Sequence, residues 1–145
     1  QMEIVHGREI KDATYAYVVD CKGEFPQKIP AILANNTHLQ AAENPKGTKL
    51  GAVYFDTSVT AKGKFGTFRV SSPAALFAEK KDGKLILTVT DALMKKGLNR
   101  LTVYTSVPVR GEGVSKQSKN IYEIKIPLPA GAHCGQPATV TLELL

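Results

Sequence analysis

The sequence has 145 residues, of which 43% are hydrophobic and 22% are charged, a composition that is typical of a globular protein and excludes a disordered one. The net charge is +6, and many of the lysines lie at expected turns, where they would keep the protein soluble and protect the edges of β-sheets. The alternative interpretation of this positive charge is attraction to a polyanion. A nucleic-acid partner is not expected, because tryptophan and strands that interleave aromatic with basic residues are absent, and no apolar run reaches the roughly 18 residues of a membrane span.

The N-terminal part of the chain is polar and carries charges of both signs, which is not the pattern of a signal peptide. Because Gln1 stands ahead of Met2, we expect a mature or excised piece of a longer protein. The two cysteines, Cys21 and Cys134, lie far apart in the sequence. They predict either a long-range disulfide in an oxidising compartment or two unpaired thiols.

Apolar residues alternate with polar ones along most of the chain, and this period of two predicts β-strands. The alternation is clearest in these runs: Leu85–Thr90, Leu101–Val109, Tyr122–Leu128 and Thr139–Leu144. Tyr15–Val19 is also a predicted strand, with Tyr15, Tyr17 and Val19 on one face and the apolar Ala16 and Val18 on the other. Asp82-Gly83 lies between two runs and predicts a type I′ hairpin turn, because both central residues of that turn need positive φ. The polar stretch 110–120 is predicted to be a mobile loop.

The expected fold is an all-β antiparallel β-sandwich of about eight to ten short strands, with at most one or two short helical turns. Pro26 and Pro30 limit one candidate helical turn, and Gly97 closes the other. A boundary near Asn35 separates the first strands from a continuous series of hairpins. One domain is the simplest expectation, and two small sandwich units are the alternative.

No pattern of catalytic or metal-binding residues stands out, so we expect no catalytic residue, no metal site and no cofactor. His133 and Cys134 are adjacent in a glycine-rich loop, but neighbouring side chains on an extended chain point apart, which favours a surface turn over a reactive couple. Seven acids are expected at strand ends, and solvated turn residues are favoured over a hydrolytic carboxylate pair. They are Asp20, Glu24, Glu43, Asp56, Glu79, Asp82 and Asp91.

All five tyrosines fall within expected strands, which predicts core or rim positions. Tyr104 and Tyr122 are the first candidates for a sugar-stacking platform, although the lack of tryptophan counts against a sugar-binding face. Asn35-Asn36-Thr37 matches a glycosylation sequon, which on its own indicates little.

Several segments, taken in order, resemble the C-terminal region of polysaccharide lyase family 8, which includes hyaluronate, chondroitin AC and xanthan lyases. Those that resemble the end of the family's large central β-domain are His6-Gly7 and Ala13–Val19. Those that resemble the start and the strands of its smaller C-terminal domain are Ile32–Ala41, Gly51–Phe55, Val70–Ala74 and Leu85–Asp91. The chain departs from the family pattern at Ala92-Leu93, where Pro-Thr usually follows the aspartate.

The resemblance implies that residues 1–34 end the central β-domain of a parent lyase and that residues 35–145 form its C-terminal β-sandwich domain. Members of the family cleave acidic, glycosaminoglycan-like polysaccharides by β-elimination, with catalytic residues in an N-terminal helical toroid. That toroid is absent here, so the resemblance implies a non-catalytic part of a secreted or periplasmic bacterial enzyme. Its partners would be the toroid and, through the parent enzyme, the polysaccharide. The alternative is an autonomous carbohydrate-binding, structural or adhesive β-sandwich module.

Overall fold

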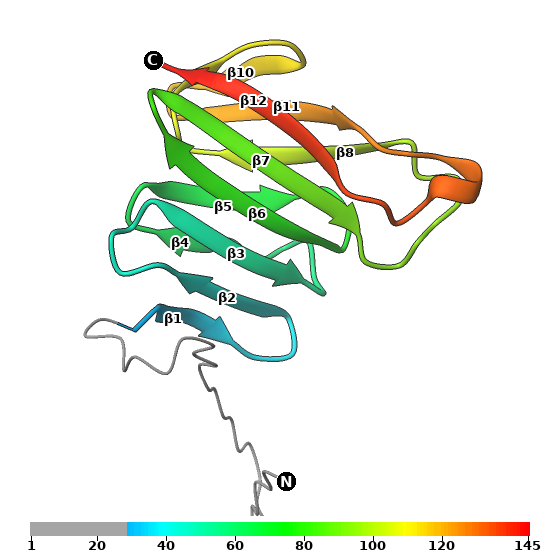
Figure 1. The fold of residues 1–145 in the computed structure, drawn as a ribbon, viewed down its shortest axis with the longest axis horizontal. Helices are drawn as coiled ribbons and strands as arrows, with labels where there is room; N and C mark the ends of the chain where they lie inside the picture. Colours follow the sequence, from blue (N-terminus) through cyan, green and yellow to red (C-terminus); the bar gives the residue numbers. More distant parts are fainter. Residues whose placement is uncertain (1–28) are drawn as a thin grey trace, which may run out of the picture.

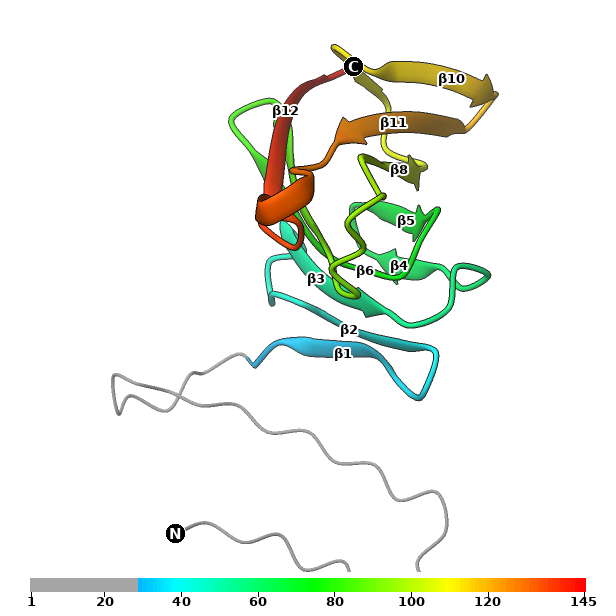
Figure 2. The ribbon, with the colours of Figure 1, turned by 90° about the vertical axis from the view of Figure 1, so that its right-hand side faces the viewer.

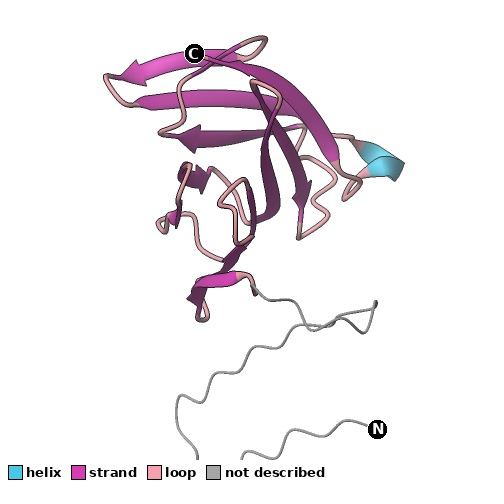
Figure 3. Ribbon diagram, turned by 60° about the vertical axis from the view of Figure 1, so that its left-hand side comes forward, coloured by secondary structure: helices cyan, strands magenta, loops and turns pink. Residues whose placement is uncertain are grey.

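The computed structural model describes residues 29–145, and these fold into two antiparallel β-sheets that face each other (Figure 2). The strands are β1 (Ala31–Asn35), β2 (Leu39–Glu43), β3 (Lys49–Tyr54), β4 (Ala61–Gly63), β5 (Gly66–Val70), β6 (Ala74–Lys81), β7 (Lys84–Asp91), β8 (Arg100–Thr105), β9 (Val109–Arg110), β10 (Val114–Ser118), β11 (Ile121–Pro127) and β12 (Ala138–Leu144). One 3₁₀ turn, η1 (Gly131–His133), precedes β12 (Figure 3). The predicted all-β antiparallel sandwich is confirmed, with twelve strands in this part of the chain rather than eight to ten.

The two sheets differ in size and in the way the chain visits them. The larger sheet has the order β1-β2-β3-β6-β7-β12-β9, and the smaller has the order β10-β11-β8-β5-β4. The chain enters at β1, at one edge of the larger sheet, and β12 returns from the far end of the molecule to pair with β7 (Figure 1). β1 pairs with β2, so the residues on both sides of the predicted boundary at Asn35 share one sheet. No helix between residues 29 and 145 is long and apolar enough to cross a membrane.

The core lies between the two sheets and follows the alternation seen in the sequence. In β7 the inward side chains are Leu85, Leu87 and Val89, all buried, while the residues between them are only half-buried. β8 and β11 face them from the smaller sheet with the same alternation. The inward faces predicted for these strands are therefore confirmed, and burial of their apolar side chains drives the sheets together.

Two connections between strands, the Asp82-Gly83 turn and the stretch 110–120, test the turn and loop predictions. Asp82 and Gly83 have φ values of 49° and 72°, so the predicted β6–β7 hairpin turn with two positive φ angles is confirmed. The predicted loop at 110–120 is wrong in its centre, because residues 114–118 form β10 and pair with β11. β10 is an edge strand with mostly exposed polar side chains, which explains why it lacks the apolar alternation of the inner strands.

A single buried tyrosine joins the two sheets by a hydrogen bond. Tyr54 on β3 is fully buried, and its hydroxyl donates to the backbone carbonyl of Phe68 on β5, with an O···O distance of 2.6 Å. Burial raises the pKa of this hydroxyl well above its ordinary value, because the charged phenolate is poorly solvated there. The folded structure therefore requires the neutral phenol.

Replacing Tyr54 by phenylalanine should lower the free energy of unfolding by about 1–2 kcal/mol, because the Phe68 carbonyl loses its donor. The folded-state pKa lies above the unfolded one, so the contribution of Tyr54 is complete below about pH 10 and falls as pH rises above it. Urea unfolding at pH 8 and pH 11 should therefore show a smaller alkaline loss for Tyr54→Phe than for the unmodified chain. Tyr104→Phe, on the outer face of β8, is the matched control and should change neither value appreciably.

Candidate functional site

The outer faces of the two sheets have opposite chemical character. On the larger sheet, outward positions of β2, β3 and β6 carry small or apolar side chains, including Ala42, Gly51, Val53, Ala75 and Phe77. Antiparallel sheets with one face in water normally carry polar side chains there. The outer face of the larger sheet is therefore the first candidate for a functional surface.

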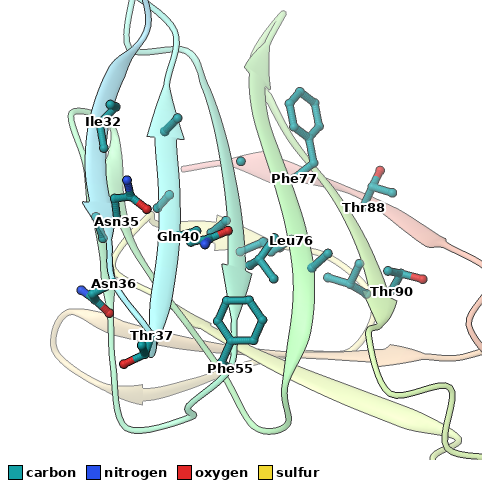
Figure 4. Close-up of a pocket in the computed structure, with 18 of the residues that line it drawn as sticks. Ile32, Asn35, Asn36, Thr37, Gln40, Phe55, Leu76, Phe77, Thr88 and Thr90 are labelled. Atoms are coloured by element: carbon teal, nitrogen blue, oxygen red, sulfur yellow. The ribbon is translucent and has the colours of Figure 1, made fainter. Parts of the chain in front are cut away.

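These outward residues line a hollow of about 1030 Å³ that extends across β1, β2, β3, β6 and β7, and we call it the apolar hollow (Figure 4). Cross-strand pairing places Gly51 between Ala42 and Phe77. A Cβ atom added to Gly51 would meet no atom within 4 Å, so the middle of the hollow is open. The bulky side chains of Ile32, Phe55 and Phe77 line the same hollow, and their exposed fractions are 58%, 53% and 42%.

One end of the hollow is held by the tight connection between β1 and β2. The Asn36 side-chain oxygen accepts hydrogen bonds from the backbone N–H groups of His38 at 2.9 Å and Leu39 at 3.0 Å. His38 Nδ1 lies 3.3 Å from Asp56 Oδ2. The backbone N–H and side chain of Ser58, followed by His38, lower the pKa of Asp56. These local contacts fix the loop that follows Asn35, the first residue of the sequon and the last residue of β1, which also lines the hollow.

The lining of the hollow is suited to contact and not to chemistry. It contains no acid, base or thiol, and its polar members are amides and threonine hydroxyls such as Gln40, Thr88 and Thr90. Among residues 29–145, no group of three or more His, Cys, Asp or Glu side chains could hold a metal ion. Such a surface can bind an apolar partner, but it supplies neither the base nor the charge stabilisation that bond cleavage requires.

Asp20 and Glu24 lie outside the described residues. Of the other five acids, Glu79 is half-buried within β6, and Glu43 and Asp91 are buried, so these three differ from their prediction as solvated turn residues. Glu43 and Asp91 do lie at strand ends, but their exposed fractions are only 2% and 4%. Asp91 accepts hydrogen bonds from the backbone N–H groups of Leu93 at 3.0 Å and Lys95 at 2.5 Å. Glu43 accepts one from the Lys64 N–H at 2.6 Å. Both carboxyl groups hold loops in place, and the prediction of solvation was wrong for them.

Tyr104 and Tyr122, the first candidates for sugar stacking, lie on opposite sides of the smaller sheet. Tyr104 is half-buried on the outer face, and the Arg69 guanidinium lies 4.5 Å from its ring centre. Tyr122 points into the core with an exposed fraction of 8%, and Lys116 lies 5.8 Å from its ring centre. They do not form one platform, and of the two only Tyr104 contributes substantially to an outer surface.

The cysteine predictions concern the glycine-rich loop before β12. His133 is exposed at the end of η1, and Cys134 is half-buried just after it. Cys21, the predicted disulfide partner of Cys134, lies outside the described residues, so the disulfide stays a prediction. His6 and the strand predicted at Tyr15–Val19 also lie outside them.

Comparisons with known proteins agree with the architecture. Residues 31–98 match the family model of polysaccharide lyase family 8, C-terminal beta-sandwich domain. Similar solved structures include a chondroitin AC lyase from Streptomyces coelicolor A3 in complex with chondroitin sulphate and a mutant of that enzyme, each with a TM-score of 0.57 and 15% sequence identity. Each match covers 80% of this chain but only 15% of the solved chain. No curated protein sequence matches the chain.

Proposed function

Because residues 31–98 match the family model of the C-terminal beta-sandwich domain of polysaccharide lyase family 8, we propose that the chain is the non-catalytic tail of a larger enzyme of that family. That enzyme cleaves acidic, glycosaminoglycan-like polysaccharides by β-elimination. The family match over β1 to β7 is the observation that carries the proposal. The residues before β1 then end the preceding domain of the same enzyme.

The chemistry of β-elimination supports assigning catalysis to another part of the parent enzyme. A base must remove the proton next to a uronate carboxylate, while polar or cationic groups neutralise that carboxylate. The apolar hollow is lined by no base and no cation. The buried carboxyl groups of Glu43 and Asp91 are already bound to backbone N–H groups of their own loops. These features suit a structural tail.

An absorbance assay separates this proposal from the alternative of an active module. The chain 1–145, incubated with chondroitin sulphate or hyaluronan, should give no increase in the absorbance of unsaturated uronate. The full-length polypeptide that contains it should give a steady increase with at least one acidic polysaccharide. Turnover by the chain alone would overturn the non-catalytic role, and a full-length enzyme inactive on every acidic polysaccharide would overturn the family activity proposed for the parent.

A further inference from the structure

The apolar hollow is a surface that residues 29–145 leave exposed. The core lies on the opposite side of the larger sheet, and Phe77, at the centre of the outer face, is 42% exposed. The outer face of the smaller sheet carries polar and charged residues such as Arg69, Thr102 and Lys125. A contiguous exposed apolar surface on one sheet only is typical of a protein contact. The question is which protein surface covers it.

The lining disfavours a polysaccharide as the occupant. A polyanion needs cations or many hydrogen-bond donors, and the hollow is lined by no lysine, arginine or histidine. Its aromatic residues, Phe55 and Phe77, lack the polar edge that sugar-binding tyrosines and tryptophans provide. The small residues in the middle, Gly51 and Ala42, instead leave a recess that an apolar side chain from another surface can fill.

Symmetry disfavours a second copy of the chain. In a two-fold dimer through this face, each hollow would meet the hollow of the partner. Two recesses with open centres at Gly51 leave a void between them, and such a void forfeits the packing energy that a dimer needs. A partner that fills the hollow therefore needs a protruding apolar surface, which a second copy of the hollow does not present.

The position of the hollow indicates where that surface comes from. β1 is the edge strand at which the chain enters the larger sheet, and Ile32 on β1 lines the hollow (Figures 1 and 4). The solved relatives are much longer, since the match covers 15% of their chains. The sequence upstream of β1 also contains a short apolar run, Tyr15–Val19.

We propose that the apolar hollow is the interface with the part of the same polypeptide that precedes β1, and that this partner surface presents protruding aromatic or branched aliphatic side chains. The inference rests on the proposed function, in which the chain is the tail of a longer enzyme. Contact across the outer face would bury Ile32, Phe55 and Phe77 and would hold the tail rigidly against the preceding domain.

Photo-crosslinking of the full-length polypeptide tests the interface. Phe77 is replaced by p-benzoylphenylalanine, and Tyr104 on the outer face of the smaller sheet is replaced in a separate control protein. After illumination, mass spectrometry should map the crosslink from position 77 to residues N-terminal to β1 of the same polypeptide, with a yield at least tenfold above that from position 104. A crosslink to a second copy, a crosslink to polysaccharide, or no crosslink from a folded protein would overturn the inference.

A charged side chain placed inside the hollow provides a second test of the interface. Gly51→Glu adds a side chain into open space, so the chain should still fold, as its thermal unfolding will verify. In the full-length protein that carries the photo-crosslinker at position 77, this change should reduce the crosslink yield at least tenfold, and an unchanged yield would contradict the proposal. Ala75→Glu replaces it if Gly51→Glu does not fold. Polysaccharide cleavage is measured in parallel, because an inactive protein that still forms the crosslink refutes the proposed function and not the interface.

Discussion

Replacing Phe68 by alanine should lower the free energy of unfolding by about 3–5 kcal/mol, the largest effect that we expect from a single substitution. The Phe68 side chain is completely buried between the two sheets, and its ring centre lies 5.4 Å from that of Phe65. Removal of the ring creates a cavity that β-sheets held by many backbone hydrogen bonds cannot easily close. The change is measured by urea unfolding of the chain, followed by far-UV circular dichroism.

Phe77→Ala is the matched control, because it also removes a phenylalanine side chain, but from the outer face of the larger sheet and not from the core between the sheets. Phe77 is 42% exposed and lies outside the core, so its loss should change the free energy of unfolding by less than about 1 kcal/mol. Equal losses at the two positions would contradict the placement of the core between the sheets. A small loss at Phe77 also means that the hollow can be mutated for interface experiments without unfolding the chain.

The sequence predicted the sheets well wherever one face of a strand is buried and the other is not. In the run from Leu101 to Val109, every second residue is buried, as the alternation requires. The Asp82-Gly83 turn was equally readable, because few residues adopt two consecutive positive φ angles. These features depend on neighbours within a few positions, and a local pattern therefore suffices to find them.

The features that the sequence reasoning missed depend on contacts between distant segments. β10 has polar residues on both faces and becomes a strand only because β11 offers it a pairing edge. Glu43 looks like a solvated acid at a turn, and its burial arises from Lys64, which lies 21 positions further along the chain. No periodicity in the local sequence encodes either contact.

The sequence does contain a signal for the apolar hollow, namely strands that are apolar on both faces, and a search for alternating residues does not detect it. In β6, Ala74 to Ala78 are apolar at every position, and β3 is similarly apolar from Leu50 to Tyr54. A strand that is apolar on both faces is typically covered on both faces. With the inner face packed on the smaller sheet, such runs indicate a second covering surface, and the sheet order brings β3 and β6 side by side to form it.

Replacing Glu43 by alanine should lower the free energy of unfolding by about 2–4 kcal/mol, the second largest effect that we expect. The Glu43 side chain is 2% exposed, and its oxygen accepts the Lys64 backbone N–H at 2.6 Å. Alanine leaves this N–H without its acceptor and leaves a cavity beside Leu50 and Gly63. Urea unfolding of the chain measures the loss.

Two further variants separate the hydrogen bond from the charge at this position. Glu43→Gln keeps the size of the side chain and an acceptor oxygen for the Lys64 N–H, so it should retain most of the stability that alanine removes. Glu79→Ala tests a glutamate on the outer face of β6, where the carboxylate lies 3.1 Å from the Lys49 ammonium group and stays accessible to solvent, and it should cost less than about 1 kcal/mol. If Glu43→Ala were as mild as Glu79→Ala, the carboxyl group of Glu43 would not support the loop that begins at Lys64. Its burial would then reflect only the side-chain stem that it packs into the core.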